Sequence, residues 1–140
     1  MMKVFLDTNI LIDYVDHREK RIYAELILSM ADEGIISLYA SYLSYANMGY
    51  ILRKRTQGER YQLIREARSL ATVLPCDAFQ LDEGLMTEVK DFEDMLQYQC
   101  ALASGCDVVV TNNKKDFHEF CSLPFLTSEE FLLQFEYEDN

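Results

Sequence analysis

Short apolar runs alternate along this chain with longer segments of helical periodicity. Each apolar run has the length of a buried strand and predicts one. The predicted strands cover residues 4–6, 35–40, 72–74, 107–111 and 124–127. The sequence predicts helices after residue 9, around residues 22–30 and from residue 41 onward. Further helices are predicted over residues 59–70, 78–89 and 91–104, and from residue 128 onward. Gly34 and Gly105 follow two of these helices, as helix stops do.

This alternation predicts an α/β fold of three layers (α/β/α), with helices on both faces of a mostly parallel central sheet. The chain has 140 residues, and hydrophobic residues make up 49% of it. That is the size of one domain, with enough apolar material for a core. Because no repeat, low-complexity tract or linker interrupts the pattern, we predict a single domain over residues 1–140.

Apolar positions at helical spacing indicate the side of each helix that faces the core. They are Ile22, Leu26, Ile27 and Met30 in one helix, Leu43, Ala46, Tyr50 and Ile51 in the next, and Phe92, Met95, Leu96, Gln99 and Ala103 along 91–104. At the start of the last helix, Ser128 precedes two acids, which predicts an N-cap at Ser128.

Charge and cysteine content narrow the class of protein. A formal net charge of −11 argues against broad, sequence-independent attraction to nucleic acid, although it does not exclude a nuclease. The four cysteines form no Cys-x-x-Cys pair, which predicts reduced, mostly buried thiols rather than a zinc site. No apolar run approaches the roughly 18 residues of a membrane span, and the chain enters a strand without a leader segment. We therefore expect a cytoplasmic protein with no membrane partner.

Polar side chains follow two of the predicted strands where those strands end. Asp7, Thr8 and Asn9 follow the first strand. Thr111, Asn113, Lys114 and Asp116 end or follow the strand at 107–111. Since ligands of open α/β sheets bind outside the carboxyl ends of the strands, these clusters predict one oxygen-rich pocket built from both ends of the chain.

A third acidic cluster lies at the start of the helix at 91–104. Asp94 sits in its first turn, flanked by Asp91 and Glu93. Carboxylates forced together repel one another, and Mg²⁺ bound through carboxylates and waters relieves that repulsion. The alternative is that each acid caps a helix or builds a turn. The combination favours Asp7, Asp94 and Asp116 as metal ligands.

Three segments of the chain resemble motifs of PIN-domain ribonucleases. Residues 7–13 (DTNILID) resemble the opening motif, residues 91–102 the central acidic helix, and residues 111–117 (TNNKKDF) the closing motif. The resemblance implies a parallel sheet between helices and cleavage of RNA that depends on Mg²⁺ or Mn²⁺. It also implies a toxin that a small antitoxin protein neutralises, and a homodimer.

One position departs from the family pattern. PIN domains carry a Glu in the helix after the second strand, where this chain has Asn47. An Asn keeps an acceptor oxygen but removes one negative charge. The acidic quartet is thereby reduced to Asp7, Asp94 and Asp116, with Asp91 or Glu93 as candidates to compensate. Support for the metal ligands or the scissile phosphate is expected from Thr8, Asn9, Asn47, Thr111, Asn113 and Lys114.

Basic residues concentrate in one segment of this acidic chain. Six of the 13 Lys and Arg residues are Arg53, Lys54, Arg55, Arg60, Arg65 and Arg68. They predict either a contact surface for RNA or an antitoxin, or a solvated helical face. The tyrosines Tyr39, Tyr42, Tyr45 and Tyr50 are expected to pack in the core or at a dimer contact.

These patterns and the resemblance together predict a metal-dependent endoribonuclease, and the resemblance implies the toxin of a toxin–antitoxin pair. The first alternative is a catalytically weak or silent PIN fold that binds RNA or protein, which Asn47 favours. The second is a Mg²⁺-dependent phosphohydrolase of small molecules. Uptake of Mn²⁺ separates the first alternative from the nuclease, and turnover of generic phosphate esters separates the second.

Overall fold

The computed structural model describes residues 1–139, and the side chains of residues 1–135. Five parallel strands form one sheet in the order β3-β2-β1-β4-β5. The strands are β1 (Met2–Leu6), β2 (Ile36–Ser41), β3 (Thr72–Leu74), β4 (Val108–Val110) and β5 (Phe125–Leu126). The chain starts in the centre of the sheet, so the end of β1 lies between the ends of β2 and β4.

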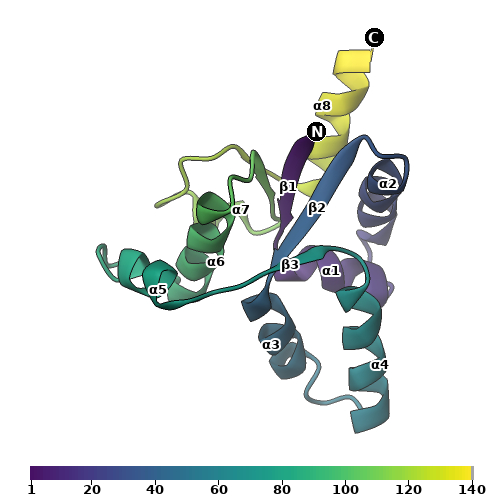
Figure 1. Cartoon of the computed structure of the whole chain (residues 1–140). Coiled ribbons are helices and arrows are strands. Elements are labelled where there is room, and N and C mark those ends of the chain that lie inside the picture. The colour runs from purple at the N-terminus through teal and green to yellow at the C-terminus, as the bar shows by residue number, and fades with distance from the viewer. Residues whose placement is uncertain (140) are drawn as a thin grey trace.

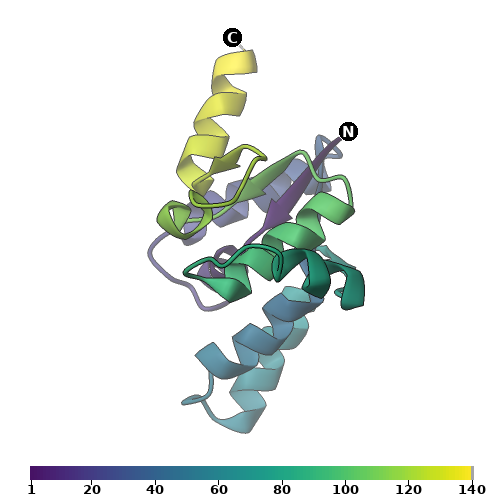
Figure 2. The same cartoon turned by 90° about the vertical axis from the view of Figure 1, so that its left-hand side faces the viewer.

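Helices connect these strands, and one more helix follows the last strand. They are α1 (Thr8–Val15), α2 (Arg21–Asp32), α3 (Tyr42–Ile51), α4 (Gln57–Arg68), α5 (Ala78–Gly84), α6 (Phe92–Ala103), α7 (Lys114–Phe117) and α8 (Ser128–Asp139). In Figure 1, α1 and α2 lie on one side of the sheet, and α5, α6 and α7 lie on the other. Figure 2 shows α8 at one end of the molecule and the α3–α4 pair at the opposite end. The predicted three-layer α/β architecture is confirmed.

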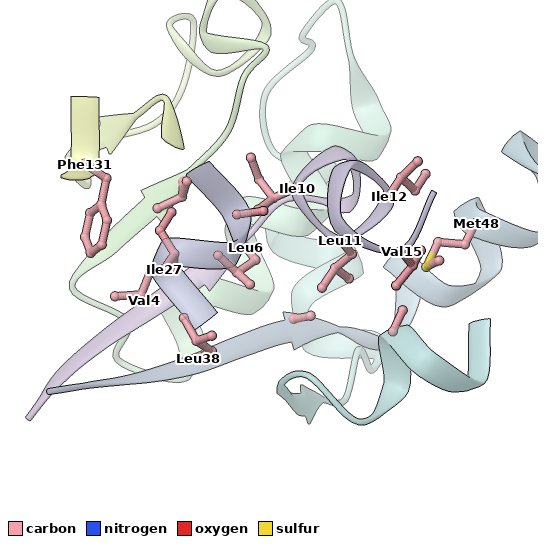
Figure 3. Close-up of a cluster of buried hydrophobic side chains, with 14 of the residues drawn as sticks. Val4, Leu6, Ile10, Leu11, Ile12, Val15, Ile27, Leu38, Met48 and Phe131 are labelled. Atoms are coloured by element: carbon pink, nitrogen blue, oxygen red, sulfur yellow. The ribbon is translucent and has the colours of Figure 1, made fainter. Parts of the chain in front are cut away.

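Side chains alternate between the two faces of a strand, so the sheet packs against helices through one hydrophobic cluster on each face. Val4 and Leu6 of β1 join the larger cluster with residues of α1 and α2 and with Phe131 of α8. Figure 3 shows these side chains converging from the strands and helices. Phe5 points to the other face and packs in a second cluster with residues of α6 and α7.

The predicted helices are present, but their buried faces match the predicted ones only in part: Ile27 and Met95 are buried as predicted. In α2, Ile22 is 54% exposed and Leu26 47% exposed, whereas Ala24 and Ile27 are buried. In α3, Tyr50 and Ile51 are exposed, and the buried residues are Ser44 and Met48. The apolar residues of α3 surround the helix, so periodicity does not select a face there; in α2 they form one wide side, of which Ile27 is buried and Ile22 and Leu26 lie at the exposed edge.

Two local predictions are wrong in detail. The helix predicted to reach residue 89 ends at Gly84, where an added Cβ would lie 3.0 Å from Leu96 Cδ2, so α5 packs tightly against α6. The cap of α8 is Thr127 rather than Ser128. Thr127 Oγ1 accepts a hydrogen bond from Glu130 N (3.1 Å), and Glu130 Oε1 accepts one from Thr127 N (2.9 Å). Ser128 is buried against Asn112 instead.

The prediction of four reduced cysteines is also wrong. Cys76, in the loop after β3, forms a disulfide with Cys100 of α6, and their Cα atoms are 6.1 Å apart. Because 24 positions separate the two residues, only the docking of the loop onto α6 brings them together. Cys106 and Cys121 are free. Within residues 1–139, no helix is long and apolar enough to cross a membrane.

Candidate active site

Asp7 lies between β1 and α1, and the residue is 4% exposed. It is the N-cap of α1, and its Oδ1 accepts a hydrogen bond from Thr8 N (2.8 Å). Its Oδ2 accepts one from Thr111 Oγ1 (2.9 Å), at the end of the neighbouring strand β4. The two polar clusters that follow β1 and β4 are therefore in direct contact at one edge of the sheet.

The first turn of α6 supplies three further acids. Asp91 is the N-cap, and its Oδ1 accepts a hydrogen bond from Asp94 N (3.0 Å). One carboxylate oxygen each from Asp91, Glu93 and Asp94 lie within 4.8 Å of one another. Asp94 is 4% exposed, while the other two are half-buried.

These acids share a pocket of about 260 Å³ with Asp7. Its walls come from the end of β1 and the start of α1, from α3, from the start of α6, and from the loop after β4. The lining residues are Asp7, Thr8, Asn9, Asn47, Tyr50, Ile51, Asp91, Glu93, Asp94 and Asn113. No Lys, Arg or His of the described chain is among them.

The pocket disfavours the charged forms of its two buried acids. Burial raises the pKa of Asp7 to about 6, even though the hydrogen bonds from Thr111 and Thr8 act in the opposite direction. Burial also raises the pKa of Asp94 to about 10, helped by the negative charge of Asp7 and by contact with Glu93. Since no cation of the described chain lines this pocket, a bound positive ion would lower the pKa of both acids and stabilise their ionised forms.

Asp116 and Lys114 lie outside this pocket. Asp116, in the short helix α7, accepts a hydrogen bond from Asn113 Nδ2 and so adjoins the pocket through that residue. The Nζ of Lys114 instead forms an ion pair with Glu130 Oε1 of α8 (3.0 Å). The structure therefore brings Asp7 and Asp94 together directly and places Asp116 one side chain away.

The sequence analysis missed one residue, Gln97 of α6, which is fully buried. Its Oε1 accepts a hydrogen bond from Ser41 Oγ at the end of β2. Its Nε2 lies within hydrogen-bond distance of three oxygens: Thr8 Oγ1 (3.3 Å), Ser44 Oγ (3.1 Å) and Glu93 Oε1 (3.0 Å). The predicted stripe of this helix contains Gln99 instead. A signal was present, because Gln97 lies four positions after Glu93 and therefore above it on the same helix face.

The basic segment lies mostly on the exposed surface around α4. Arg55 pairs with Asp16 (2.7 Å), and Arg65 lies over the ring of Tyr61. The guanidinium of Arg53 lies 4.1 Å from the ring centroid of Tyr50, which lines the pocket. Arg53 is therefore the member of this segment that is linked to the site. Tyr50 and Tyr42 are exposed, which excludes the core and leaves a dimer contact as the predicted role of these two tyrosines.

Comparison with known proteins agrees with this geometry. The family model for the PIN domain matches residues 3–115. The chain is 25% identical over 135 residues to the protein named Ribonuclease VapC1 of Aquifex aeolicus (strain VF5). The matched region covers 92% of each of the two chains.

Solved structures support the same fold. DNA-bound VapBC from Salmonella typhimurium superposes with a TM-score of 0.70 at 20% identity, over 91% of this chain and 99% of that chain. VapBC-1 from nontypeable Haemophilus influenzae gives 0.67 at 20% identity, over the same shares of the two chains. Since the family model covers residues 3–115 of the 140 and includes Asp7 and Asp94, this chain belongs to the PIN domain family.

Proposed function

We propose that this protein is a metal-dependent endoribonuclease, the toxin of a toxin–antitoxin pair. The observation that carries the proposal is the pairing of Asp7 and Asp94, two carboxylates buried in one pocket to which the described chain contributes no cation. Mg²⁺ and Mn²⁺ bind such all-oxygen sites. A cation there also explains why the fold keeps two acids whose charged forms it otherwise disfavours.

The residues present fit a divalent cation. Asp7 and Asp94 would hold it, with Asp116 approaching through Asn113. Thr111 and the Thr8 amide orient the carboxylate of Asp7. When bound, the cation lowers the pKa of an attacking water and stabilises negative charge on the phosphate oxygens. Asn9 and Asn113 are neutral lining groups that would orient the scissile phosphate.

An RNA strand is the substrate that suits the rim of this pocket. Tyr50 and Ile51 provide an exposed apolar and aromatic edge, on which a base can stack. Arg53, against Tyr50, provides positive charge for the backbone. The relative named as a ribonuclease supports the same substrate class. The structural neighbours are VapBC proteins, which supports a protein antitoxin as partner. We also propose a homodimer and a cytoplasmic location.

One observation favours a second candidate, a silent PIN fold that binds RNA or protein. The side chain at the position of the family's helix Glu is the amide of Asn47, which brings no charge to the pocket. If the site is silent, the protein should neither bind Mn²⁺ nor cleave RNA when Mn²⁺ is added. The nuclease proposal predicts both.

Removal of the metal is therefore expected to abolish activity. The purified protein, stripped with EDTA, should leave a fluorescent RNA intact, and Mn²⁺ added in excess should restore cleavage. Calorimetry of the same sample should show Mn²⁺ binding. Cleavage that persists in EDTA would contradict the proposal, as would hydrolysis of p-nitrophenyl phosphate without any cleavage of RNA, which indicates a small-molecule phosphohydrolase.

A further inference from the structure

Glu93 of α6 reaches across the pocket to Asn47 of α3. We propose that Glu93, held by the side-chain amides of Asn47 and Gln97, supplies the carboxylate that PIN domains otherwise draw from the helix after the second strand. This inference rests on the proposed metal site and specifies which side chains complete it.

Both amide donors to Glu93 contact the same oxygen of its carboxylate. Asn47 Nδ2 donates a hydrogen bond to Glu93 Oε1, and Gln97 Nε2 donates another to the same oxygen (3.0 Å). No N–H group of the described residues donates to Oε2. A carboxylate held at one oxygen by two amide donors is oriented in the way that outer hydrogen bonds orient metal ligands, and Glu93 also contacts Asp94 of the same pocket.

Asp91 fits this role less well, although it lines the same pocket. Its Oδ1 accepts the hydrogen bond from Asp94 N that caps α6. Asp7 also caps its helix through one oxygen, so capping by itself does not exclude Asp91 as a ligand. What distinguishes Glu93 is its longer side chain, which reaches from α6 to the amide of Asn47 in α3.

The amide at position 47 is the partner that this arrangement requires. A Glu at position 47 would place a second carboxylate against Glu93 Oε1, where the two charges would repel each other. The amide of Asn47 instead donates a hydrogen bond. With Asn47 on α3, the carboxylate on this side of the pocket comes from Glu93 of α6.

Gln97 makes this position rigid. Ser41 Oγ donates to its Oε1, and its Nε2 contacts Thr8 Oγ1 and Ser44 Oγ at the start of α1 and in α3. All four side chains are buried. Since a buried amide with all its groups paired has a fixed orientation, Gln97 presents its N–H to Glu93 before any cation binds. Gln97 and Asn47 are thus positioning residues, and Glu93 is the proposed ligand.

Mn²⁺ calorimetry on four forms of the full chain tests the proposal: wild type, Glu93→Gln, Glu88→Gln, and Glu93→Gln combined with Asn47→Glu. A Gln at position 93 keeps a carbonyl oxygen for the two amide donors but loses the charge. We expect Glu93→Gln to weaken Mn²⁺ binding by about 10- to 100-fold. The matched control Glu88→Gln removes an equal charge from an exposed loop residue and should bind like wild type. The double variant returns a carboxylate from α3 and should recover most of the loss.

Each outcome bears on a separate claim. Wild-type affinity in Glu93→Gln overturns this inference while leaving the proposed function in place. Absence of Mn²⁺ binding by the wild type overturns the proposed function and this inference together. If Glu93→Gln fails to fold by circular dichroism, Asn47→Ala provides the test, because it removes one donor and leaves Glu93 in place. Weaker Mn²⁺ binding by Asn47→Ala supports the inference, and unchanged binding overturns it.

Discussion

Asp7→Asn is expected to reduce Mn²⁺-dependent RNA cleavage by at least about a hundredfold while the fold stays intact. Asp7 is the buried carboxylate that joins the ends of β1 and β4. An Asn in its place keeps an oxygen for the Thr8 amide and an N–H that can donate to the Thr111 hydroxyl. Only the charge is lost, and with it most of the attraction for a cation. Cleavage of a fluorescent RNA under single-turnover conditions measures the effect.

Asp107→Asn is the matched control for this experiment. Asp107 precedes β4, and its Oδ2 accepts a hydrogen bond from Lys3 N (2.8 Å). It therefore also bridges β1 and β4, but at their amino ends, away from the pocket. We expect the control to cleave RNA like the wild type, with matching circular dichroism for all three proteins. Full cleavage by Asp7→Asn would show that Asp7 does not bind the catalytic metal.

The stability of the metal-free protein is expected to fall as the pH rises from about 4 to 7. The pKa of Asp7 is raised from 3.8 to about 6 by burial, so the folded state holds its proton more tightly than the unfolded state does. Below pH 3.8 both states are protonated and the contribution to stability is complete. Above pH 6 both states are ionised, and about 3 kcal/mol has been lost from this group alone. The raised pKa of Asp94 extends the loss in the same direction to higher pH.

Asp7→Asn isolates this contribution, because the variant has no proton to lose at that position. Urea unfolding in EDTA should show the variant gaining stability relative to wild type as the pH rises from 4 to 7, by up to about 3 kcal/mol. Mn²⁺ at pH 7 should stabilise the wild type and leave the variant nearly unchanged. If the free energy of unfolding changes with pH in the same way for the two metal-free proteins, the pKa of Asp7 is not raised in the folded state, which contradicts this prediction.

The sequence predicted which segments along the chain are strands and which are helices, because apolar runs and helical periodicity reflect burial directly. It did not predict the order of the strands within the sheet. It did locate Asp7 and Thr111, since polar residues that directly follow buried strands must lie at the carboxyl edge of the sheet. The buried faces of α2 and α3 were predicted only in part, because Ile27 is buried as expected but Ile22 and Leu26 are not. Ile22 and Leu26 are as apolar as Ile27, and only the packing of α2 on the rest of the fold decides which of them is covered.

The parts of the site that the sequence missed depend on contacts between distant segments. Gln97 is polar, so a search for an apolar stripe passes over it, yet its four hydrogen-bonding neighbours make its burial favourable. The pairing of Asn47 with Glu93 joins residues 46 positions apart. From the sequence, Asn47 looks like the loss of a ligand. In the structure, it is the hydrogen-bond donor to another carboxylate.

The most direct test is a crystal of the protein soaked in Mn²⁺, with anomalous scattering recorded near the manganese edge. The account predicts a peak inside the pocket, within coordinating distance of Asp7 and Asp94 and on the side of Glu93. Carboxylates that stay empty at saturating Mn²⁺, or a peak bound only at the protein surface, would contradict it.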